Sequence, residues 1–82
     1  MEFTRKEIAL MQGALVLAMN AADNLASEAA SSGDYHAVAG KPERAFAYHE
    51  RARKLRAGSA SMHQLFTRLV AEHGDLRKEN QL

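Results

Sequence analysis

Residues 8–19 read IALMQGALVLAM, and this stretch decides the fold of the 82-residue chain. Ten of its twelve residues are apolar, and only Gln12 and Gly13 interrupt the run. The stretch is shorter than the roughly 20 apolar residues that span a bilayer, and it is too apolar all round for a helix with one face in water. We therefore expect a helix that its own chain and a second copy cover on several sides, with no membrane association.

The composition favours an all-α protein with a single domain, residues 1–82. Alanine is abundant, β-branched residues are few and proline occurs once, which suits helices and leaves little material for strands. A chain of this size is barely large enough for one core, and oligomerisation is a common remedy. The chain has no cysteine, so we expect a cytoplasmic protein without disulfides. Arg5 and Lys6 precede the apolar run as in a signal peptide, but Glu7 and the helical sequence that follows argue against secretion.

A first helix is predicted to begin after Thr4 and to stop within residues 31–34. Thr4 and Glu7 have the spacing of a capping box, and Phe3 and Ile8 are placed to form the accompanying hydrophobic staple. Gly33 is the expected residue after the helix end. The seam of this helix has spacings that alternate between three and four residues; it consists of Ile8, Met11, Leu15, Ala18, Ala22, Leu25 and Ala29.

A second helix is predicted from Pro42, which suits the first helical position, to about Glu79. Its apolar stripe keeps the same spacing throughout; it consists of Ala45, Tyr48, Ala52, Leu55, Ser59, Met62, Phe66, Leu69, His73 and Leu76. Gly58 lies within this stripe, where it marks either a kink in one long helix or a corner between two shorter helices. The corner would give a three-helix bundle.

A long antiparallel helical hairpin is the fold that we expect from these two helices. If the turn centres near Ala37, the bulky residues 8–19 face the bulky residues 55–66, and the alanine-rich parts face each other. The same register places Asp23 near Arg51 and Asp34 near Lys41. One long second helix satisfies all of these pairings, whereas a three-helix bundle would pair one long helix with two short ones and leave helix ends uncovered.

Apolar side chains outside this seam predict that the hairpin dimerises into a four-helix bundle. In a monomer they would form a large exposed patch, and a two-fold partner is the common solution. The predicted dimer interface consists of Leu10, Ala14, Val16, Leu17, Phe46 and Leu65. A homodimer and a subunit that awaits a different chain both remain open.

The sequence indicates no catalytic residue, no metal site and no cofactor. The four histidines, His36, His49, His63 and His73, include no pair four residues apart and no zinc-binding motif. In the hairpin, His63 is expected near Met11 within an apolar layer. There is no nucleophile motif and no glycine-rich phosphate loop. An enzyme is therefore not expected.

A basic segment offers the main alternative to protein binding. Residues 7–34 carry acidic side chains without lysine or arginine, whereas residues 41–56 are mainly basic. The candidate contacts to another protein or to nucleic acid are Arg44, Arg51, Arg53, Lys54 and Arg56. A paired hairpin with such a face resembles, in architecture only, the small plasmid RNA-binding regulators of the ROP type. The net charge is only +1, so these cations also fit a solvated helix surface.

Residues 43–55 also resemble the second helix of a tetratricopeptide repeat. This likeness extends over about 30 residues, and solenoids need several stacked repeats. Ser32, His36 and His49 stand where that repeat has bulky, apolar or aromatic residues. No binding residue is carried over from it.

The sequence thus leaves three functional hypotheses. The first is a non-enzymatic regulator, inhibitor or adaptor that binds another protein through a helical surface, as a homodimer. The second is RNA or DNA binding through residues 44–56. The third is an apolar ligand held between the helices.

Overall fold

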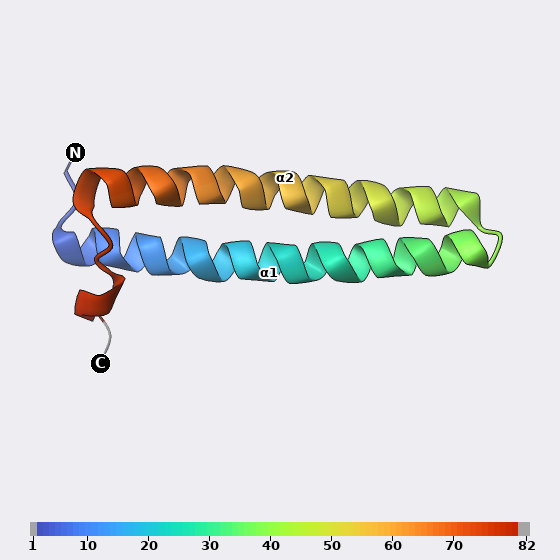
Figure 1. Ribbon diagram of the computed structural model, residues 1–82, viewed down its shortest axis with the longest axis horizontal. Coiled ribbons are helices and arrows are strands. Elements are labelled where there is room, and N and C mark those ends of the chain that lie inside the picture. Colours follow the sequence, from blue (N-terminus) through green and yellow to red (C-terminus); the bar gives the residue numbers. More distant parts are fainter. Residues whose placement is uncertain (1, 81–82) are drawn as a thin grey trace.

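The computed structural model describes residues 2–80 and consists of two long antiparallel helices, which confirms the predicted hairpin. Helix α1 comprises Arg5–Val38 and helix α2 comprises Pro42–His73. The two helices lie side by side along their whole length, and the chain then folds back across the beginning of α1 to a short 3-10 helix, η1, Arg77–Asn80 (Figure 1). The molecule measures 53 × 26 × 17 Å.

The predicted signals at the start of each helix are present. The Glu7 backbone N–H donates to the Thr4 side chain, and the Thr4 backbone N–H donates to the Glu7 carboxylate at 2.8 Å, so the capping box is complete. These hydrogen bonds hold the pKa of Glu7 below its usual range. Pro42 is the first residue of α2, where its missing N–H leaves no helical bond unmade.

The predicted stop of α1 is wrong, since the helix runs through Gly33 and ends at Val38. Gly33 does not have the positive φ of a helix-ending glycine; among the described residues only Gly40 and Gly74 have one. Gly33 is instead buried at the contact with α2, where an added Cβ would lie 2.5 Å from the ring of His49. The turn is made by Gly40, whose φ of 77° suits glycine.

The predicted register is wrong as a result of this later turn. Asp34 accepts a 3.0 Å hydrogen bond from His49 rather than lying near Lys41, and His36 stacks on Tyr48 with ring centroids 5.2 Å apart. Likewise, no ion pair joins Asp23 to Arg51 among the described residues. The bulky residues 8–19 therefore lie against a later part of α2 than the one predicted.

Helix α2 is uninterrupted at Gly58, so the corner and the three-helix bundle do not occur. The helix ends at His73 rather than near Glu79, because Gly74 adopts a φ of 76° and turns the chain back. His63, expected in an apolar layer, is exposed. Most of the predicted stripe of α2 does face α1, and Ala45, Ala52 and Ser59 are its buried members.

The core is narrow and made mainly of alanine. Of the eight buried apolar residues in the described part of the chain, six are alanine, and the two large ones are Ile8 and Leu76. Ala26, fully buried, packs with Ala29 and Ala52, whereas Leu25 from the predicted seam is 46% exposed. The smallest side chains occupy the contact because they let two helices approach closely. The long apolar side chains are consequently left at the edges and on the outer faces.

Candidate interaction surface

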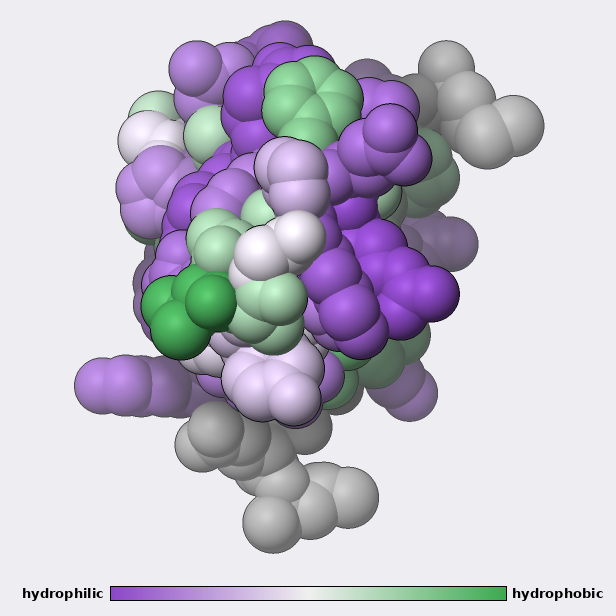
Figure 2. Space-filling view, turned by 90° about the vertical axis from the view of Figure 1, so that its right-hand side faces the viewer, coloured by the Kyte–Doolittle hydropathy of each residue, from purple (hydrophilic) through white to green (hydrophobic). Residues whose placement is uncertain are grey.

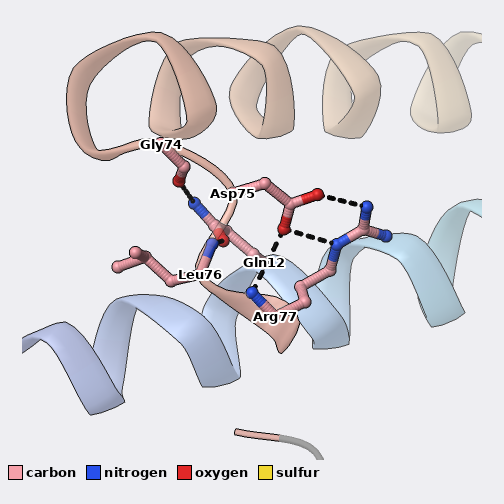
Figure 3. Close-up of polar contacts among 5 residues, drawn as sticks. All are labelled: Gln12, Gly74, Asp75, Leu76 and Arg77. Atoms are coloured by element: carbon pink, nitrogen blue, oxygen red, sulfur yellow. Dashed lines mark hydrogen bonds and ion pairs between the residues drawn. The ribbon is translucent and has the colours of Figure 1, made fainter. Parts of the chain in front are cut away.

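Residues 74–78, which we call the strap, close the open end of the hairpin. Gln12, the polar residue in the middle of the apolar stretch, is fully buried beneath it. Its side-chain amide donates to the Gly74 carbonyl at 2.9 Å, and its side-chain oxygen accepts from the Leu76 backbone N–H at 2.9 Å (Figure 3). Leu76 packs on Ile8 and Ala9. A buried amide is tolerated here because both of its ends are paired.

The strap is also held by its own ion pair. The Arg77 guanidinium donates to both carboxylate oxygens of Asp75, at 2.9 and 2.6 Å, and the Arg77 backbone N–H donates to the same carboxylate at 3.1 Å (Figure 3). These side-chain and backbone hydrogen bonds lower the pKa of Asp75 to about 2. The guanidinium also lies over the ring of Phe66, 5.0 Å from its centroid, which ties the strap to α2.

Sequence reasoning identified Gln12 only as an interruption and missed its role. The available signals were a single amide within an apolar run and a glycine, Gly74, before the last leucine-containing segment. Neither signal names its partner, because residues 12 and 74 are far apart in the sequence.

Two apolar grooves flank the first half of α1. The inner groove, of about 490 Å³, lies between the two helices; it is lined by Phe3, Ile8, Met11, Ala14, Leu15, Ala18, Leu65, Leu69 and His73. The outer groove, of about 520 Å³, lies on the other side of α1; it is lined by Ala9, Leu10, Gly13, Ala14, Val16, Leu17 and Arg77. Ala14 belongs to both, so one apolar surface continues around α1 from the inner groove to the strap.

The structure brings four of the six predicted interface residues together. Leu10, Ala14, Val16 and Leu17 all line the outer groove, and Leu17 is 73% exposed. Leu65 lines the inner groove instead. Phe46 is exposed but lies in the turn half of the hairpin, apart from the other five.

The turn end of the hairpin differs from this apolar surface. Hydrophilic side chains surround a smaller group of apolar ones there (Figure 2), and Val38, Tyr35 and Phe46 are 91%, 69% and 68% exposed. The stacked rings of His36 and Tyr48 lie here, and the His36 Nδ1 atom is buried without a hydrogen-bond partner among the described residues.

The five predicted cationic residues are all exposed but do not form one continuous face. Arg44 and Arg51 line a shallow pocket beside Tyr48, and Arg51 and Lys54 line the next one along α2. Arg53 is paired with Glu50, with nitrogen and oxygen 2.9 Å apart; this pairing lowers the pKa of the Glu50 carboxyl.

Within residues 2–80, no group of three or more histidine, aspartate or glutamate side chains is placed to hold a metal ion. By length and composition alone, α1 meets the criteria for a membrane-crossing helix, which core helices and signal sequences also meet. No protein-family model matches the chain, and neither a curated protein nor a solved structure shows significant similarity to it.

Proposed function

We propose that this chain is a non-enzymatic regulator, inhibitor or adaptor that binds another protein through a helical surface, and that it works as a homodimer. The observation that carries the homodimer is the apolar outer face of α1, where Leu10 and Leu17 are 55% and 73% exposed, and the exposed Tyr35 and Phe46 outside this face leave a surface for the other protein. Contiguous apolar surfaces of this kind mark interaction sites. The alanine core of the hairpin adds a second reason, because small buried side chains contribute little hydrophobic free energy.

Static light scattering on the eluting size-exclusion peak tests the homodimer. The wild type is expected at twice the chain mass, and Leu17→Glu is expected at the chain mass. The matched control is Ala60→Glu, which places the same charge at an exposed position of α2 and should leave the dimer intact. A wild-type monomer across the accessible concentrations would refute the homodimer.

Reconstitution tests the binding of another protein. A protein that co-purifies with the tagged chain is itself purified and titrated against the wild type and against variants at exposed apolar positions outside the outer groove, such as Tyr35→Ser and Phe46→Ser. Saturable binding that these variants weaken supports the proposal. Failure to form a complex from purified components refutes that partner.

Nucleic-acid binding is the second candidate, and the shared pocket of Arg44, Arg51 and Tyr48 favours it. Two cations beside an aromatic ring can hold a phosphate and stack on a base. Binding of a labelled single-stranded RNA should then fall steeply with salt, and Arg44→Glu with Arg51→Glu should abolish it. Arg53→Glu is the control, since Arg53 already has an acidic partner. Binding that the double variant leaves unchanged would refute this candidate.

A further inference from the structure

Gly13 lies on the outer face of α1, where nothing in its own chain requires a glycine. It lines the outer groove between Leu10 and Leu17, and apart from its chain neighbours and the nearby backbone of its own helix, no described atom lies within 4 Å of the place where a Cβ would stand. Its backbone is helical, with no positive φ. Glycine within a helix costs about 1 kcal/mol relative to alanine. At Gly33 the His49 ring fills this space, whereas Gly13 leaves room for another backbone to approach from outside the chain.

The hairpin exposes more surface than a compact chain of its mass. Its accessible surface is 6122 Å², whereas a folded monomer of 9.0 kDa is expected to expose about 4,900 Å². Its radius of gyration is 17.0 Å, against about 12 Å for a compact domain of this length. The excess of about 1,200 Å² per chain is enough to supply a standard interface, which removes about 800 Å² from each partner. The exposed surface is therefore large enough for an interface with a second copy of this chain.

We infer that two copies pack through the outer faces of their α1 helices in antiparallel orientation, and that these helices cross at Gly13 and Ala14. Leu10 of each copy then lies beside Leu17 of its partner, and the small residues at the crossing let the two backbones approach. This arrangement deepens the homodimer proposed above and rests on it.

The distribution of charge on the outer face favours the antiparallel orientation. Lys6 and Glu28 share the helical spacing of Leu10 and Leu17 and are both exposed. A parallel pair would place Lys6 beside its own copy and Glu28 beside its own copy, and like charges at neighbouring positions are destabilising. The antiparallel pair separates these like charges. The antiparallel pair also packs the apolar first half of α1 against the same half of its partner and leaves the outer side of the polar second half in water.

Single cysteines test the orientation directly, because the natural chain has none. Ala14→Cys lies at the proposed two-fold axis and should form a disulfide-linked dimer under mild oxidation. Leu10→Cys and Leu17→Cys should cross-link poorly alone but efficiently when the two variants are mixed. Ala60→Cys, an exposed site on α2, is the control and should stay uncross-linked.

The outcomes separate this inference from the homodimer itself. If Leu10→Cys, Ala14→Cys and Leu17→Cys each cross-link with themselves, the helices are parallel, and the inference is wrong while the homodimer stands. If light scattering shows a dimer but none of the three α1 cysteine variants cross-links, only the proposed helix crossing at Gly13 and Ala14 is wrong. A wild-type monomer overturns both.

Substitution of two glycines gives an independent test of the crossing. Gly13→Ala should raise the dimer dissociation constant roughly tenfold, because a methyl group at a close helix contact forces the backbones apart. Gly58→Ala is the matched control, since Gly58 is also within a helix and has the same open space around it. It should leave the dissociation constant unchanged. A Gly13→Ala variant that dimerises as tightly as the wild type would contradict the crossing.

Discussion

The pairing of Gln12 with the strap predicts a specific loss of stability when the amide is removed. Gln12→Met keeps the length of the side chain and deletes both hydrogen bonds, to Gly74 and Leu76. If the strap stays docked, two net hydrogen-bond contributions of about 1 kcal/mol each are lost. If it detaches, Leu76, which is 4% exposed, loses burial worth about 1.5–3 kcal/mol. Both routes predict a decrease of about 2 kcal/mol in the free energy of unfolding.

Urea unfolding followed by circular dichroism, at one fixed protein concentration, measures this decrease. Amide hydrogen exchange at Leu76 shows whether the strap has detached. Gln64→Met is the matched control, because Gln64 is exposed on α2 and should change the stability by less than about 0.5 kcal/mol. The reasoning is refuted if Gln12→Met behaves like this control and the Leu76 amide stays protected.

A double-mutant cycle between Gln12→Met and Leu76→Ala should also give less than additive losses, because both act through the same strap. Gly33→Ala should displace the His49 ring, since the new methyl group would lie 2.5 Å from it, and the NMR shifts of His49 should show the loss of its hydrogen bond to Asp34. Thr4→Ala should cost about 1 kcal/mol in urea unfolding through loss of the cap. Asp75 has a pKa of about 2 in the folded chain against an ordinary 3.8. Its contribution to the stability of the folded chain is therefore present above pH 3.8 and is lost as the pH falls towards 2. The methyl NMR shifts of Leu76 should follow this loss of the Asp75–Arg77 pairing, and Asp75→Asn should remove the pH dependence.

The hairpin could be predicted because its signals are local. The capping box at Thr4 and the proline at the start of α2 act over one turn, and the alternating spacing of apolar residues is read from the sequence directly. The continuous stripe through Gly58 favours one long helix over a corner, and α2 is uninterrupted there. Hairpin architecture therefore follows from sequence without knowledge of the register.

The register could not be predicted, because it depends on which glycine ends the first helix. Gly33 and Gly40 look alike in the sequence, yet one makes room for His49 and the other adopts a positive φ. Choosing the earlier glycine moved the turn and misassigned the partner of Asp34, although the alanine-rich parts of the two helices do face each other. The same ambiguity concealed the strap, since Gly74 was counted as part of a continuing helix.

The burial of Gln12 beneath the strap and the apolar outer face both follow from the alanine contact between the two helices. Because alanines occupy most of the contact between the helices, the large side chains of residues 8–19 find only partial cover within the chain. Leu76 of the strap covers the side of α1 that carries Ile8 and Ala9, and its backbone N–H pairs with the side-chain amide of Gln12. Leu10 and Leu17 stay exposed, although Arg77 of the strap lines the same groove. If a second copy covers them, releasing the strap with Gln12→Met should lower the stability of each chain and also reduce cross-linking at Ala14→Cys, because the wall that Arg77 gives to the groove is then displaced. Cross-linking that stays unchanged would mean that the strap lies outside the dimer interface.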